Sequence, residues 1–168
     1  SSDLGYSLTP FYDWIEIDPS QGGDGIDLGI SDGGNGNNIS NSTKYIDLPF
    51  NFSFYGNNYP LCVIMENGWI SLEATSQEGS DNDSIFDEDS PKGSIFGFWD
   101  NLNPITAESL DGGGYVRYHI DENRIVIWYD HVEHYFSPDY YDFQIVLYST
   151  GEIHFNYREM NGEVDSAT

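Results

Sequence analysis

Residues 48–72 hold the pattern that most restricts what this chain can fold into. Apolar and polar side chains alternate across 48–54, which is the period of a strand with one buried face and one solvated face. The turn-forming residues 55–58 follow, then an apolar run, and then Asn67-Gly68, a strong hairpin signal. Two consecutive hairpins with no helical pattern between them predict an antiparallel all-β domain.

The rest of the chain repeats this organisation, with short runs of aromatic and β-branched residues between turn residues. We expect strands within 11–17, 26–30, 45–54, 60–72, 94–100, 115–120, 124–129, 143–148 and 152–157. About ten closely spaced strands without a helical period predict an all-β, antiparallel two-sheet β-sandwich of jelly-roll type. We expect residues 11–168 to form this single domain and residues 1–10 to form an N-terminal extension.

The charge balance is strongly acidic, with 5 lysine and arginine residues against 29 acidic residues and a net charge of −24. Nucleic acids and anionic membrane surfaces are bound through clustered basic residues, so this composition argues against both as partners. No apolar stretch approaches the roughly 20 residues that span a bilayer, so we expect no membrane insertion. Three explanations of the acidity compete: solubility of a secreted protein, carboxylates for calcium, and adaptation to a salty habitat.

Four segments occur in a distinctive order: YDWIEI at 12–17, LPFNFSFYGNNY to MENGWISL at 48–72, SIFGFWDNLNP at 94–104, and GGGYVRYHIDENRIVIWYDHV to YDFQIVLYSTGEIHFNYREM at 112–160. Together they resemble the nidogen-like class of extracellular β-sandwich modules. More closely, they resemble a module of large secreted bacterial and archaeal proteins that often stands beside peptidase or surface-repeat domains. The resemblance implies an extracellular or cell-surface location and a non-catalytic role in adhesion, substrate targeting or scaffolding.

Two acidic segments are candidates for calcium, the one cofactor that we expect. The segment 81–89 holds five carboxylates in nine residues, and its aspartates are Asp81, Asp83, Asp87 and Asp89. It is not an EF-hand, because Ile85 stands where that loop has an oxygen ligand. Asp24 and Asp27 lie in a G-G-x-G-x-D segment like the start of a calcium-binding nonapeptide, although its echo follows after eleven residues rather than nine. The alternative is a solvated acidic loop at 81–89 and a plain glycine-rich loop around Asp24 and Asp27.

Asp130, His131 and His134 form an H-x-x-H pair with an adjoining carboxylate, a set of ligands that zinc accepts. On a regular strand the two histidines would point to opposite faces, and a third ligand is not evident near them. The sequence therefore offers zinc only as a minor alternative to ordinary surface side chains.

Aromatic residues crowd the loop expected at 131–142, where they would be costly to expose. The four that matter are Tyr135, Phe136, Tyr140 and Tyr141. They either pack on the core, form a contact for a protein partner, or stack on a carbohydrate; exposed and coplanar rings would favour the carbohydrate.

Four sequons fit N-glycosylation by pattern. Their asparagines are Asn38, Asn41, Asn51 and Asn82. Several sequons arise by chance in an asparagine-rich chain, and the alternation across 48–54 places Asn51 on the solvated face.

We expect no enzymatic activity, because no nucleophile elbow or triad spacing occurs and Cys62 lies in an apolar run. The expected function is extracellular binding, adhesion or scaffolding, with a cell-surface protein or glycan, or another copy of the chain, as partner. One alternative is a carbohydrate-binding module. Another is a subunit of an extracellular filament, in which the alternating Leu4, Tyr6 and Leu8 of one copy complete the sheet of the next.

Overall fold

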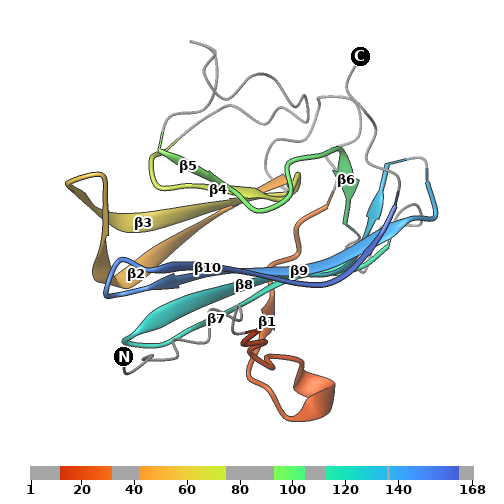
Figure 1. Ribbon diagram of the computed structural model, residues 1–168, viewed down its shortest axis with the longest axis horizontal. Coiled ribbons are helices and arrows are strands. Elements are labelled where there is room, and N and C mark those ends of the chain that lie inside the picture. The colour runs from red at the N-terminus through yellow and green to blue at the C-terminus, as the bar shows by residue number, and fades with distance from the viewer. Residues whose placement is uncertain (1–11, 32–41, 75–92, 105–112, 136, 163–168) are drawn as a thin grey trace, which may run out of the picture.

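The computed structural model describes residues 12–31, 42–74, 93–104, 113–135 and 137–162. These residues form ten β-strands and a short 3-10 helix, Pro19–Gln21. The strands are β1 (Ile26–Asp27), β2 (Thr43–Phe54), β3 (Asn57–Met65), β4 (Trp69–Ser71), β5 (Ser94–Phe96), β6 (Leu102–Asn103), β7 (Tyr115–Ile120), β8 (Arg124–His134), β9 (Tyr140–Tyr148) and β10 (Ile153–Asn161). They make two antiparallel sheets that face each other (Figure 1), so the predicted all-β sandwich is confirmed.

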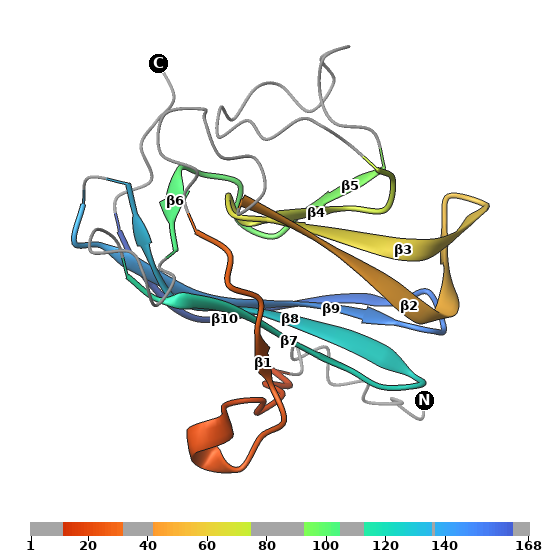
Figure 2. The ribbon, with the colours of Figure 1, turned by 180° about the vertical axis from the view of Figure 1, so that it is seen from behind.

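The larger sheet has the order β1-β7-β8-β9-β10, with β6 paired to the far end of β8. The smaller sheet has the order β2-β3-β4-β5, and Figure 2 shows it from behind, above the larger one. Strands β10 and β2 are therefore terminal strands of their sheets, and both are long, with nine and twelve residues. We call the side of the larger sheet that is turned away from the smaller sheet its outer face.

Strand β2 follows the alternation predicted from the sequence. Leu48 and Phe52 are buried while Pro49, Asn51 and Ser53 are exposed. The turn to β3 lies at Tyr55-Gly56, and both residues have positive φ, 46° and 82°. Two consecutive positive φ angles fit the right-handed twist of a tight hairpin, which explains the glycine in this turn.

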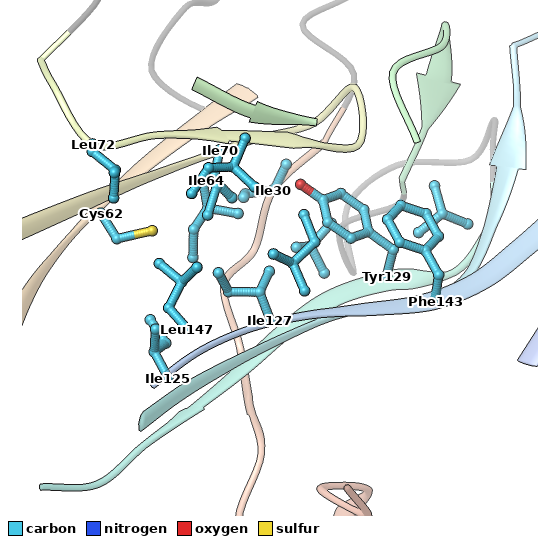
Figure 3. Close-up of a cluster of buried hydrophobic side chains, with 14 of the residues drawn as sticks. Ile30, Cys62, Ile64, Ile70, Leu72, Ile125, Ile127, Tyr129, Phe143 and Leu147 are labelled. Carbon is cyan, nitrogen blue, oxygen red and sulfur yellow. The ribbon is translucent and has the colours of Figure 1, made fainter. Parts of the chain in front are cut away.

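The core lies between the two sheets. Cys62, Ile64, Ile70 and Leu72 from the smaller sheet meet Ile125, Ile127, Tyr129, Phe143 and Leu147 from the larger one (Figure 3). The Tyr129 hydroxyl crosses the core and donates to the Met65 carbonyl at 2.6 Å. Because that carbonyl belongs to the end of β3, a buried hydrogen bond joins the two sheets.

The predicted strand over 11–17 was wrong for the described residues 12–17, which pair with no strand. They instead cross the outer face as a strap, seen in red below the sheet in Figure 1. The Gln144 side chain forms the hydrogen bonds that a neighbouring strand would otherwise form with the Ile15 backbone. Its Oε1 accepts from Ile15 N at 3.2 Å and its Nε2 donates to Ile15 O at 2.7 Å. An extended segment lying on a sheet also buries alternate residues, so its sequence pattern resembles that of a strand.

The strap covers apolar side chains that would otherwise face solvent. Trp14 packs edge-on against Trp128, with ring centroids 5.9 Å apart, and Ile17 is buried beside it. Asn156 donates to the Asp13 carbonyl at 2.9 Å, which ties the strap to β10 as well. The outer face of the larger sheet is therefore a second small core.

The expected loop at 131–142 is also shorter than predicted. Strand β8 continues to His134 and β9 begins at Tyr140, so most of the aromatic segment is a hairpin. The ladder between β8 and β9 shifts register between Tyr129 and Val132. A bulge at that point interrupts the alternation of buried and exposed residues. For this reason the segment 131–142 was predicted to be a loop.

Candidate functional site

The bulge in β8 brings two polar residues together on the outer face. His131 adopts φ 50°, a left-handed conformation that is uncommon for a residue other than glycine. Its Nδ1 lies 2.9 Å from Asp130 Oδ1, so neighbouring residues that would alternate on a regular strand point to one place. Bulges of this kind re-aim side chains and are frequent beside functional sites.

Asp142 of β9 completes the group. Its side chain is fully buried, and its Oδ1 accepts a hydrogen bond from the Trp128 indole at 2.7 Å. Its Oδ2 lies 3.5 Å from His131 Nδ1 and has no hydrogen-bond partner among the residues that the structure describes. Burial raises the pKa of the Asp142 carboxyl, whereas the Trp128 hydrogen bond and nearby Arg158 act in the opposite direction. We call these three residues the Asp130–His131–Asp142 cluster.

Two arginines flank the cluster from the neighbouring strands. Arg117 Nε donates to Asp130 Oδ2 at 3.0 Å. Arg158 Nη1 lies 3.6 Å from Asp142 Oδ2, and the guanidinium covers the Trp14 ring at 3.5 Å from its centroid. Arg158 itself stands at a second register shift, between Tyr157 and Glu159 of β10.

Tyr140 closes the cluster on the β9 side. Its ring stacks on the His131 imidazole, with centroids 5.1 Å apart and planes inclined by 23°. Its hydroxyl donates to Glu159 Oε2 at 2.8 Å, so the ring is held at both ends. The His131 imidazole is thus oriented by an aromatic face on one side and by carboxylates on the other.

The predicted zinc group of Asp130, His131 and His134 is only partly brought together. His134 points elsewhere, with its Nδ1 2.8 Å from Tyr135 O and its Nε2 3.4 Å from Asp100 Oδ1. Asp142 takes the third place instead. Asp142 was not among the predicted ligands, because it lies on another strand and approaches His131 only through the bulge. One signal was available: residues two apart on a strand share a face, so alternation along β9 places Asp142 on the same face as Gln144.

The four predicted aromatic residues do not form one surface. Tyr141 is 2% exposed and packs on Phe98, with centroids 4.4 Å apart, so its assignment to partner binding is corrected to core packing. Tyr140 lies on the opposite face, against His131. Tyr135 is half-buried, with its backbone N donating to Asn101 O at 2.9 Å, and Phe136 lies outside the described residues.

The predicted calcium and glycosylation residues are mostly outside the described ranges. This applies to Asp81, Asp83, Asp87, Asp89, Asn38, Asn41 and Asn82. Asp24 and Asp27 are exposed, and Asp27 Oδ1 accepts from Gly29 N at 2.9 Å within a local turn. Asn51 is exposed on β2, where a sequon is accessible.

Fold and composition define an acidic, antiparallel two-sheet β-sandwich. The chain belongs to the NIDO-related family, whose model matches residues 26–168. This nidogen-related membership indicates an extracellular module. No curated protein and no solved structure matches the chain. Among the residues that the structure describes, no helix has the length and apolar character needed to cross a bilayer.

Proposed function

We propose that this domain is a non-catalytic extracellular module that binds proteins at the β10 edge of its larger sheet, in an adhesive or scaffolding role. The observation that carries the proposal is the character of that edge. Strand β10 ends the sheet, has no strand on its other side among the described residues, and exposes 39% of Phe155 and 44% of Tyr157. An unpaired edge beside aromatic rings suits an extended peptide that adds as a further strand.

The hydrogen-bond pattern between β9 and β10 indicates which backbone groups of β10 are free to pair with an added strand. Tyr148 N donates to Glu152 O at 3.0 Å, and the ladder continues antiparallel through Val146 and His154. Because hydrogen-bonded pairs recur at every second residue, the N–H and C=O groups of Ile153, Phe155 and Tyr157 point away from β9. The register shift at Arg158 ends this regular stretch, so the receptive edge spans about the first half of β10.

Tyr157 also connects the edge to the opposite sheet. Its hydroxyl donates to the Gly97 carbonyl at 2.7 Å, and its ring stacks on Phe143 with centroids 6.1 Å apart. An added strand would therefore contact a Tyr157 ring that is already held in one position. Less side-chain freedom is then lost on binding, which lowers the entropy cost.

The chemistry of the described core supports a role without catalysis. Cys62 is fully buried, and burial raises the pKa of its thiol to about 12, so the reactive thiolate is strongly disfavoured. The His131 imidazole contacts the carboxylates of Asp130 and Asp142.

The test is selection of binders from a random peptide display library against the full chain, followed by affinity measurement for two variants. Phe155→Lys places a charge at the proposed edge, and Tyr45→Lys is the matched control on β2, where Tyr45 is 55% exposed. We expect selected peptides to lose at least tenfold in affinity for Phe155→Lys and to retain affinity for Tyr45→Lys. Equal affinity for both variants would overturn the edge assignment.

The filament alternative uses the same edge, with another copy of the chain as donor. It predicts that the mass measured by light scattering rises with protein concentration and that Phe155→Lys abolishes the rise. The carbohydrate alternative predicts binding on a glycan array that Phe155→Lys leaves unchanged. Its expected surface of coplanar rings is not formed by Tyr140 and Tyr141, which lie on opposite faces.

A further inference from the structure

We propose that the Asp130–His131–Asp142 cluster binds a divalent transition-metal ion of the zinc type on the outer face of the larger sheet. This site is independent of the β10 edge, because its ligands come from β8 and β9. A metal here would join the bulged part of β8 to β9 and stabilise the hairpin that the two strands form.

The donor atoms suit such an ion. Asp130, His131 and Asp142 each offer one ligand atom, and these three atoms lie within 4.8 Å of one another. His131 Nδ1 is 2.9 Å from Asp130 Oδ1 and 3.5 Å from Asp142 Oδ2. One imidazole nitrogen and two carboxylate oxygens are ligands that zinc accepts at about 2.0–2.2 Å, often with a fourth position left to water. Magnesium and calcium prefer oxygen ligands alone, so the imidazole favours zinc over both.

The independent observation is the state of Asp142. Its side chain has no exposed surface, yet Oδ2 accepts no hydrogen bond within the described part of the chain and lies 3.5 Å from His131 Nδ1. A buried carboxylate oxygen without a hydrogen bond is costly, and a coordinated cation would remove that cost.

The remaining carboxylate oxygens are already held by neighbouring side chains. Arg117 binds Asp130 Oδ2, and the Trp128 indole binds Asp142 Oδ1. Each aspartate therefore uses one oxygen for orientation and turns the other to the common point. Metal ligands are commonly oriented in this way by a surrounding layer of hydrogen bonds.

Arg158 is the competitor of the metal for Asp142. Its Nη1 lies 3.6 Å from Oδ2, which neutralises charge without making a hydrogen bond, and its Nη2 also faces Glu16 Oε2 at 3.5 Å. A bound cation and the guanidinium would repel each other. Removing the arginine charge should therefore strengthen metal binding, whereas removing a ligand should weaken it.

The test is calorimetric titration of the full, metal-free chain with zinc chloride, repeated with magnesium chloride. His131→Asn removes the imidazole, and asparagine tolerates the left-handed backbone at this position. Arg158→Gln removes the competing charge, and His154→Asn on β10 is the matched control. We expect one zinc site that His131→Asn weakens at least tenfold, Arg158→Gln strengthens, and His154→Asn leaves unchanged.

A nuclear magnetic resonance titration identifies the ligand directly, because the chain has four histidines. Zinc should shift the ring signals of His131 and leave those of His119 and His154 in place. The proposal is overturned if His131→Asn, folded with the melting temperature of the wild-type chain or above, binds zinc as tightly as the wild-type chain. It is also overturned if magnesium binds the cluster as tightly as zinc.

Discussion

At the scale of single residues, polar groups buried between apolar layers fix how the two sheets meet. Tyr129 has no exposed surface, and burial raises the pKa of its phenol well above the ordinary value, so it stays a neutral donor. Its hydroxyl lies 2.6 Å from Met65 O and 3.3 Å from Trp69 O. Both carbonyls flank the β3–β4 turn, so one side chain of the larger sheet positions a hairpin of the smaller one.

We expect Tyr129→Phe to lower the free energy of unfolding by about 1–2 kcal/mol, because the buried Met65 carbonyl loses its donor. The ring and its stacking on Phe143 remain, so the change isolates the hydrogen bond. Urea denaturation measures the effect, with Tyr55→Phe, at a tyrosine that is 91% exposed, as the control. Equal unfolding midpoints for the two variants would mean that this bond does not contribute to stability.

At the scale of elements, regular strands could be predicted from the sequence and irregular ones could not. The alternation across β2 and the Asn67-Gly68 turn are local signals, and both were confirmed. The strap was predicted as a strand because lying on a sheet and pairing within one bury the same alternate residues. The cluster depends on where β8 bulges and on which residue of β9 then faces His131, and alternation within a single strand specifies neither.

We expect Trp14→Ala to lower the free energy of unfolding by about 2 kcal/mol, less than for a fully buried tryptophan, because Trp14 is half-buried. The change also removes the ring that Arg158 covers and leaves part of Trp128 open to water. Urea denaturation gives the energy, and a red shift of the remaining tryptophan emission reports the exposure. The control is Tyr12→Ala, on a strap residue that is 56% exposed, and it should lower the free energy of unfolding by less than about 0.5 kcal/mol. A larger decrease for this control would mean that the whole strap, and not Trp14 in particular, provides the stability.

At the scale of the whole molecule, a net charge of −24 opposes compaction by self-repulsion. Screening by salt should reduce the self-repulsion whichever cation is added. A specific site would instead give extra stability with one cation only. The predicted calcium residues in 81–89 and at Asp24 and Asp27 remain to be tested in these terms.

We expect millimolar calcium to raise the melting temperature more than sodium chloride does at matched ionic strength. Binding to the native state alone stabilises by about 2.7 kcal/mol at a hundredfold excess over Kd. A variant with asparagine in place of Asp81, Asp83, Asp87 and Asp89 should lose the calcium-specific part, and an Asp24→Asn, Asp27→Asn variant tests the second segment. Identical shifts with both salts would leave screening as the sufficient explanation.

The strap also determines where this domain can be cut. The family match begins at residue 26, but the ring that covers Trp128 is Trp14, upstream of that boundary. A recombinant fragment trimmed to the family boundary would carry an uncovered apolar patch of Val126, Trp128 and Val146, and such patches promote association between molecules. The packed structure therefore extends upstream of the family match, and a domain graft or crystallisation fragment should include the strap.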